Sequence, residues 1–211
     1  MNPSAAPASE VTARLKAEYP AARTELDWSN PLELLVATML SAQTTDVQVN
    51  RVTKSLFAKY RSAEDYADAD PGVLEEDIRP TGFYRNKARS LRAMASALVE
   101  EHGGEVPRTM AELVALPGIG RKTANVVLGN AFGVNEGIVV DTHILRVSNR
   151  LGLTENQDPV KIEHDLMRVV PKDDLTIFSH LLIFHGRRTC KARKPDCANC
   201  VLNDICPSAD L

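Results

Sequence analysis

The sequence predicts an all-α protein. Of its 211 residues, 44% are hydrophobic but only 5% are aromatic, and no long alternating run of Val, Ile, Thr and Tyr indicates a strand. Residues that favour helix starts, such as Asn30 followed by Pro31, precede apolar stretches of helical length. A chain of this length and composition is large enough to bury the core of one large domain or of two small ones.

Short helices are expected throughout the first half of the chain. Residues 1–8 are predicted to be a loose tail, and Ser9 is expected to cap a helix that ends at Pro20. The run from Leu32 to Leu40 is apolar nearly all round, which predicts a helix buried at the centre of the fold. The other helices expected in this half cover residues 46–60, 62–69, 71–78 and 85–102, with a turn at 80–82.

The second half continues the same pattern up to an irregular end. Thr109, Asp141 and Asp158 are each expected to cap a helix. A tight turn, Leu116-Pro117-Gly118-Ile119-Gly120, is expected to join two of these helices. The predicted helices cover residues 110–115, 121–132, 142–151, 159–170 and 173–185, with Gly186 beyond the last one and an irregular segment over 187–211.

All the cysteines lie in that last segment. Cys190, Cys197, Cys200 and Cys206 form the pattern C-x6-C-x2-C-x5-C. Four thiolates this close together indicate one tetrathiolate site, which suits zinc or an iron–sulfur cluster. Zinc sites with four cysteines usually use two C-x2-C pairs, and only one such pair is present, so the spacing favours a cluster. Zinc stays open as an alternative, with two disulfides as a third.

Charge gives a weaker signal than the cysteines. The net charge of −3 excludes a uniformly basic molecule, but Arg79–Arg92 and Arg187–Lys194 each hold five basic residues and no acidic one. These segments predict either a basic surface for nucleic acid or two ordinary solvated faces. No apolar run reaches the about 18 residues that a membrane span needs, and residues 1–9 lack the features of a signal peptide. We therefore expect an intracellular protein.

The glycine-rich turn and the residues after it predict a phosphate-binding helix start. Gly118 and Gly120 permit a close approach of backbone to another molecule, and the N–H groups of the following helix can bind a phosphate. Lys122 lies in the first turn of that helix, where the helix dipole, Arg121 and partial burial all favour the neutral, nucleophilic amine. The alternatives are a plain helix connection and a surface lysine that binds phosphate.

Asp141 precedes a predicted helix and is a second candidate for chemistry. Its position predicts an N-cap, and the two apolar residues before it, Val139 and Val140, suggest partial burial. A carboxylate near Lys122 could accept its proton or stabilise positive charge on a sugar. The sequence alone does not show that the two side chains meet.

Taken in order, these motifs resemble the endonuclease III family of the helix–hairpin–helix superfamily. The motifs that carry the resemblance are LLVATMLSAQTTDVQVN, GFYRNKA, LPGIGRKTANVVL, VDTHILRVSNR and the four cysteines, and together they extend from about residue 10 to residue 206. The resemblance implies two lobes. One is a six-helix barrel over residues 24–135 with the hairpin at 109–132, and the other is a cluster lobe of residues 1–23 and 136–211 with its cluster loop at 190–206.

The resemblance also implies an activity and a cofactor. The family removes damaged pyrimidines from duplex DNA and nicks the strand through a lysine Schiff base, and its catalytic lysine and aspartate match Lys122 and Asp141. Its [4Fe–4S] cluster is held by cysteines that match those of this chain, and hairpin carbonyls can hold a monovalent cation. We accordingly expect a monomeric, cytoplasmic, nucleoid-associated bacterial enzyme.

The expected DNA contacts follow from the same motifs. Gln43 would fill the gap left by the flipped base, with a polar residue at a helix end as its alternative. Phe83 matches a wedge residue that is commonly leucine in the family, so core packing stays open for it. The hairpin and the cluster loop would contact phosphates through Gly118, Gly120, Arg121, Lys191, Arg193 and Lys194. The rival functions are an adenine mispair glycosylase and a non-catalytic iron–sulfur DNA-binding protein.

Overall fold

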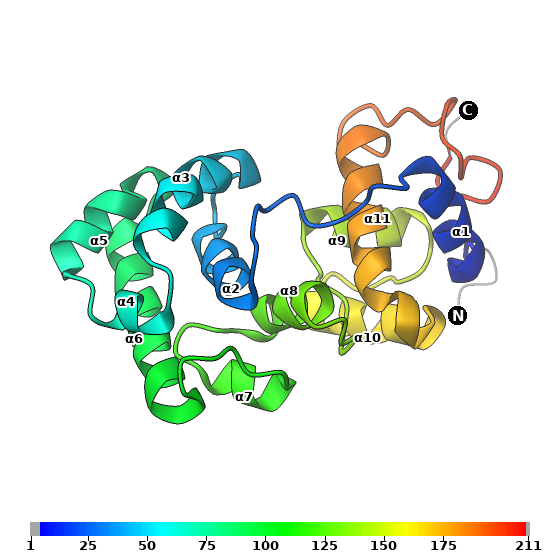
Figure 1. Cartoon of the computed structure of the whole chain (residues 1–211). Coiled ribbons are helices and arrows are strands. Elements are labelled where there is room, and N and C mark those ends of the chain that lie inside the picture. Colours follow the sequence, from blue (N-terminus) through cyan, green and yellow to red (C-terminus); the bar gives the residue numbers. More distant parts are fainter. Residues whose placement is uncertain (1–4, 210–211) are drawn as a thin grey trace. The chain divides into compact units, whose positions relative to one another are not determined.

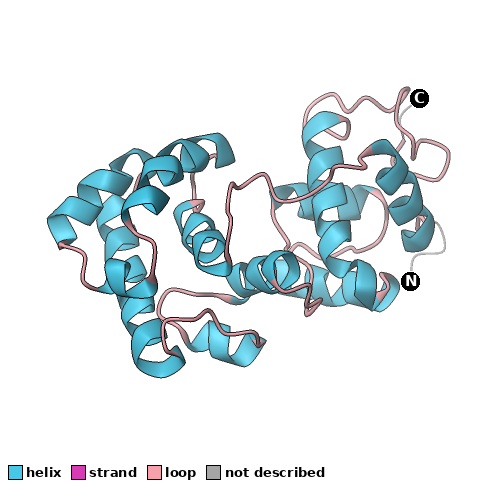
Figure 2. Cartoon of the chain, viewed as in Figure 1, coloured by secondary structure: helices cyan, strands magenta, loops and turns pink. Residues whose placement is uncertain are grey.

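The computed structural model describes residues 5–209, and every regular element in this range is a helix (Figure 2). The all-α prediction is confirmed. The chain forms two compact units (Figure 1). Unit 2 is the continuous stretch Glu25–Val134, and unit 1 combines the residues up to Thr24 with those from Asn135 onward. Each unit has a hydrophobic core of its own.

Unit 2 is built around the apolar helix α2 and the long amphipathic helix α6. The helix α2 (Pro31–Leu40) buries Leu34 and Leu35 completely and packs against α3 and α8, as its all-round apolar sequence predicts. The helix α6 (Tyr84–His102) is the longest in the unit and packs against α4 and α5. The remaining elements of unit 2 are α3 (Asp46–Lys59), α4 (Ala63–Ala67), α5 (Pro71–Ile78), η1 (Arg79–Thr81), α7 (Met110–Ala115) and α8 (Arg121–Ala131).

Local capping signals position several of these helices. Asn30 accepts a hydrogen bond from the Glu33 N–H with Pro31 at the first helical position, and Thr109 accepts one from the Glu112 N–H. The predicted Ser9 cap is wrong, because the first helix begins at Ala8, two residues earlier than predicted, and its N-cap, Pro7, makes no side-chain hydrogen bond. A serine inside the first turn cannot fulfil the capping role, since its backbone is already helical.

Unit 1 is built around the helix α11 (Leu175–Arg188), which completely buries Phe178, Leu181 and Leu182. This helix packs against α1 (Ala8–Glu18) and α9 (Thr142–Arg150). The other elements of the unit are α10 (Pro159–Val169) and η2 (Lys172–Asp174). Residues 189–209 contain turns but no helix or strand, as expected. None of the described helices combines the length and the apolar character needed to cross a membrane.

The predicted end of the last helix at Gly186 is wrong, because α11 continues to Arg188. The glycine has a packing role instead. A Cβ at Gly186 would lie 3.1 Å from His143 Cβ and 3.1 Å from Arg146 Nη2, both on α9. A Cβ here would make contacts tighter than usual with α9, and glycine avoids them.

Candidate functional site

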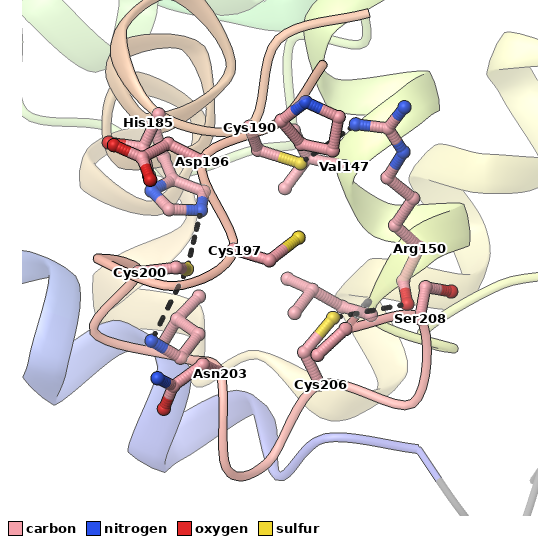
Figure 3. Close-up of a pocket in the computed structure, with 15 residues that line it drawn as sticks. Val147, Arg150, His185, Cys190, Asp196, Cys197, Cys200, Asn203, Cys206 and Ser208 are labelled. Atoms are coloured by element: carbon pink, nitrogen blue, oxygen red, sulfur yellow. Dashed lines mark hydrogen bonds between the residues drawn. The ribbon is translucent and has the colours of Figure 1, made fainter. Parts of the chain in front are cut away.

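The four cysteines of unit 1 line one cavity (Figure 3). None of them forms a disulfide, and their Sγ atoms point toward a common space (Figure 3). That cavity has about 420 Å³ not filled by protein atoms, part of it open to solvent. A donor set of four thiols around one space fits a cubane that takes one thiolate at each of four irons.

Two of the four thiols, those of Cys200 and Cys206, ionise less readily than an exposed thiol. Burial raises the pKa of both Cys200 and Cys206 above the ordinary value of a thiol, and a buried thiolate without a positive partner is unfavourable. Bound iron would supply the positive charge that deprotonates such thiols. The electrostatics of the site therefore agree with its geometry.

Side chains of unit 1 surround the cysteines with hydrogen bonds. Arg150 of α9 donates from Nη1 to Cys190 Sγ at 3.2 Å. His185 of α11 places Nε2 3.6 Å from Cys200 Sγ and Nδ1 3.3 Å from the Tyr19 hydroxyl. Burial lowers the pKa of His185 to about 4, so its ring is neutral at pH 7.

Sequence reasoning did not assign a role to either Arg150 or His185. One signal was present for Arg150: it lies four residues after Arg146, so the two arginines share a face of α9. Both donate to the loop, Arg146 to the Cys190 carbonyl at 3.1 Å and Arg150 to the Lys191 carbonyl at 2.8 Å. His185 lies inside an apolar helix and offered no comparable signal.

The same loop presents basic side chains to solvent. Lys191, Arg193 and Lys194 are exposed, and Arg150 holds the backbone at Ala192 with a further 3.1 Å hydrogen bond. The three basic side chains therefore lie on an exposed loop that Arg150 anchors, and their contact with DNA phosphates stays a prediction.

The predicted hairpin turn joins α7 to α8 in unit 2. Gly118 has φ +78°, and a Cβ there would lie 3.2 Å from Ser90 Cβ, so conformation and packing both require glycine. Gly120 differs, because its φ is −97° and a Cβ would meet nothing within 4 Å. No side chain caps α8 at Gly120, and a helix start without a side-chain cap is a place where an anion can bind.

Lys122 and Arg121 lie in the first turn of α8, and both are exposed. The expected partial burial of Lys122 is wrong, because the hairpin turns this face of α8 outward. An amine there is accessible to a large substrate. Of the three features expected to favour the neutral amine of Lys122, the helix dipole and the neighbouring guanidinium of Arg121 remain.

Gln43 and Phe83 share an uncommon backbone conformation. Together with Lys194 they are the residues other than glycine that have a positive φ in the described part of the chain, at 56°, 49° and 54°. Such conformations cost of order 1–3 kcal/mol and concentrate at functional sites. Phe83 is 65% exposed, so the core-packing alternative is wrong for it, and Gln43 is exposed as well.

One member of the basic Arg79–Arg92 segment is not on the surface. Lys87 is only 9% exposed, and it donates to the carbonyls of Leu40 and Thr81, each at 2.8 Å. Arg79 pairs with Glu76 at 2.9 Å. Arg85 pairs with Glu75 at 3.8 Å. The segment is therefore a less continuous basic surface than its sequence suggests, because one cation points inward and two are paired with carboxylates.

Asp141 of unit 1 caps α9, as predicted. Its Oδ1 accepts hydrogen bonds of 2.8 Å from the N–H groups of His143 and Ile144, and the residue is half-buried. Both bonds go to Oδ1, so within the described part of the chain Oδ2 is available to another partner. His143 has a structural position, because its Nδ1 lies 3.2 Å from Arg146 Nη2 and burial lowers its pKa.

The fold and these features define a class of protein. Residues 36–172 match the family model described as HhH-GPD superfamily base excision DNA repair protein, and residues 190–206 match the iron–sulfur binding domain of endonuclease III. The chain is thus a base excision repair protein with an iron–sulfur domain at its C-terminal end.

Relatives narrow the class to a family. The chain is 52% identical to endonuclease III of Synechocystis sp. over 96% of this chain and 92% of the relative. It is 43% identical to that of Escherichia coli over 93% of each chain. A solved structure of an endonuclease III–DNA covalent intermediate matches with a TM-score of 0.89 and 46% identity, over 95% of this chain and 94% of the other. The chain belongs to the endonuclease III family.

Membership settles several of the open alternatives. The chain is an enzyme, a DNA glycosylase that acts on duplex DNA, and it carries a [4Fe–4S] cluster. The zinc, disulfide and non-catalytic alternatives are therefore wrong. A thermostable thymine-DNA glycosylase with 24% identity also matches, with a TM-score of 0.85, so the fold is shared beyond close relatives.

Proposed function

We propose that this glycosylase removes oxidised or otherwise damaged pyrimidines from duplex DNA and then nicks the strand as an abasic-site lyase, with Lys122 as nucleophile. The observation that carries the proposal is an exposed lysine in the first turn of α8, directly after the Gly118–Gly120 turn. Further support comes from a relative with 46% identity that has been trapped as a covalent intermediate with DNA.

In the proposed mechanism, the damaged nucleotide first leaves the base stack. The Lys122 amine attacks C1′ of the sugar, and the base departs with the electrons of the glycosidic bond. The sugar ring opens to an iminium, which acidifies the C2′ proton. Loss of that proton expels the 3′ phosphate by β-elimination, and water then releases Lys122. Asp141 would accept the proton of the attacking amine and offset developing positive charge at C1′.

The four cysteines are proposed as the ligands of the cluster. When bound, the cluster cross-links a segment that has little core of its own, in which Leu202 is the fully buried residue. Cys190, Cys197, Cys200 and Cys206 would each hold one iron, so no coordination position would be left for substrate. Arg150, which donates to Cys190 and to the loop backbone, then fixes the direction in which Lys191 and Arg193 point.

The proposed DNA contacts fall into two kinds. Gln43 and Phe83 would enter the duplex and replace or displace bases, which their exposure and left-handed backbone support. The residues of the hairpin and of the cluster loop would bind phosphates without reading sequence. Hairpin carbonyls would also hold a monovalent cation. Binding to chromosomal DNA would place the enzyme at the nucleoid. The proposed phosphate contacts are Gly118, Gly120, Arg121, Lys191, Arg193 and Lys194.

Borohydride trapping tests the nucleophile. Borohydride reduces the iminium to a stable amine, so the wild-type protein should form a covalent complex with abasic-site DNA and Lys122→Gln should not. Lys161→Gln is a matched control, because Lys161 is an exposed lysine in the first turn of α10. Equal trapping by Lys122→Gln and the wild type would overturn the assignment.

A substrate panel tests the specificity. Duplexes with thymine glycol, an abasic site or an adenine mispair are compared for base release and for nicking. We expect release and nicking with thymine glycol, nicking alone at the abasic site, and no reaction with the adenine mispair. Activity confined to the adenine mispair would favour the mispair glycosylase instead.

A further inference from the structure

Lys87 is a buried cation held by neutral acceptors. Its Nζ donates to the Leu40 carbonyl at 2.8 Å, to the Thr81 carbonyl at 2.8 Å and to the Thr44 hydroxyl at 3.0 Å. Three acceptors match the three N–H donors of an ammonium. Burial lowers the pKa of Lys87, so the charge has a cost here that hydrogen bonds to carbonyl dipoles offset.

The three acceptors belong to two separate segments of unit 2. Leu40 ends α2 and Thr44 precedes α3, whereas Thr81 closes η1 just before α6. The Thr44 hydroxyl also donates to the Thr81 carbonyl. The α2–α3 segment and the η1–α6 segment are therefore joined at one point through the ammonium and the hydroxyl together.

Each joined segment presents one of the exposed, left-handed residues. Gln43 lies between Leu40 and Thr44, and Phe83 lies two residues after Thr81, with Gly82 at φ 67° between them. A left-handed backbone at Gln and Phe is unfavourable by itself and persists only where the surroundings hold it. The contacts of Lys87 with Leu40, Thr44 and Thr81 are placed to hold the left-handed backbone of both Gln43 and Phe83.

We propose that Lys87 is a positioning residue for DNA opening: it holds Gln43 and Phe83 at a fixed separation, so that both enter the duplex together when the damaged base leaves the stack. The inference rests on the proposed DNA contacts of these two residues. A fixed separation lowers the ordering cost of inserting two side chains in one step. An ammonium suits this role because it can bind acceptors from two segments at a single point.

The test uses the holoenzyme and a duplex with 2-aminopurine opposite a tetrahydrofuran abasic analogue. This base fluoresces more strongly when it is unstacked, so the signal reports insertion of side chains rather than chemistry. We expect Gln43→Ala and Phe83→Ala each to reduce the fluorescence increase. Lys87→Met, which keeps the chain length but removes the donors, should reduce it as far as the Gln43→Ala/Phe83→Ala double variant.

Excision of thymine glycol under single-turnover conditions gives a second readout. A displacement of about 1 Å costs up to about 100-fold in rate, and we expect Lys87→Met to lose tenfold to 100-fold on this scale. Adding Lys87→Met to the Gln43→Ala/Phe83→Ala variant should then cause no further loss, because residues that act through one another are non-additive. Lys59→Met is the control, since Lys59 bonds to Asp77 at the surface of the same unit, and it should match the wild type.

Thr44→Val keeps the inference testable if Lys87→Met fails to fold. It removes only the bridging hydroxyl and should lower the fluorescence increase and the excision rate in the same direction, by a smaller factor. Normal fluorescence and excision in the folded Lys87→Met variant or, failing that, in Thr44→Val would overturn the positioning role. If Gln43→Ala and Phe83→Ala are themselves unaffected, the proposed DNA contacts are wrong, and the role of Lys87 is overturned with them.

Discussion

At the scale of single residues, Asp141 combines a structural contact with a proposed chemical one. Its Oδ1 caps α9 through two backbone N–H groups, and its Oδ2 is available to another partner within the described chain. Asparagine is about as good an N-cap as aspartate but has no charge. Substitution can therefore remove the carboxylate and leave the helix start in place.

We predict that Asp141→Asn lowers the single-turnover excision rate at least tenfold, with little change in DNA affinity or in the free energy of unfolding. Asp141→Ala should lose the cap as well and be less stable by about 1 kcal/mol. Thermal unfolding, a binding titration and rapid-quench kinetics separate the three effects. Equal losses of rate and affinity in Asp141→Asn would mean that the carboxylate serves mainly to hold α9.

His180 gives a second residue-scale prediction. Burial lowers its pKa to about 4, below the about 6.5 expected in the unfolded chain. The unfolded state therefore binds more protons between these values, and the free energy of unfolding falls as the pH drops from about 6.5 to about 4. The contribution of one such histidine is at most about 3 kcal/mol.

The measurement compares unfolding of the wild type and His180→Gln at pH 7 and pH 5. The wild type should lose more stability between the two values than the variant, because glutamine does not titrate. Identical losses would show that other groups cause the acid sensitivity.

At the scale of elements, alanine should affect stability differently at a glycine inside a helix and at a glycine that precedes one. Gly186 lies inside α11, where a Cβ would be 3.1 Å from His143 and Arg146 of α9. Gly120 is the N-cap of α8, and a Cβ there would meet nothing within 4 Å. Helix propensity alone predicts that Gly186→Ala stabilises the protein. The packing of α9 against α11 opposes this effect and decides the sign of the change in the free energy of unfolding.

We predict that Gly186→Ala destabilises unit 1 by about 1–3 kcal/mol, because overpacking forces the helices apart. Gly120→Ala should lower the free energy of unfolding by at most about 1 kcal/mol, because alanine is a poorer N-cap than glycine. It should also weaken DNA binding, because its methyl group would lie where a phosphate approaches α8. Thermal unfolding and a DNA titration of both variants test the pair. A stabilised Gly186→Ala, or normal DNA binding by Gly120→Ala, would contradict the respective prediction.

The helices also show where sequence patterns were sufficient. The helix α5 has the predicted bounds, Pro71–Ile78, because Asp70 caps it and Pro71 starts it within one turn of chain. The pattern failed at Gly186, since the reason for that glycine is on α9 and not in its own helix. Local signals determine helix starts, whereas contacts between helices determine where an apparent breaker is tolerated.

At the scale of the whole molecule, the net charge of −3 makes the distribution of positive charge decisive for DNA affinity. Lys191 and Arg193 are exposed on the loop that Arg150 anchors. Each lysine or arginine that neutralises a phosphate releases counterions, so removing both should reduce the salt dependence as well as the affinity.

We predict that Lys191→Glu/Arg193→Glu weakens binding to undamaged and damaged duplexes alike and flattens the plot of log affinity against log salt by about two units of slope. Lys161→Glu, which reverses an exposed charge on α10, is the control and should keep the slope. The titration is done at several salt concentrations. An unchanged slope in the double variant would remove the cluster loop from the DNA-binding surface.

The sequence by itself determined the all-α class, most helix starts, the cysteine site and the residues at the hairpin turn, because each depends on side chains that are close along the chain. Tertiary structure alone decided that Lys87 is buried between two segments, that Phe83 is exposed, that Lys122 is not buried and that Gly186 lies where α9 and α11 approach closely. These outcomes depend on which surfaces pack together. Burial and close approach are set by residues distant along the chain, and a local pattern does not contain them.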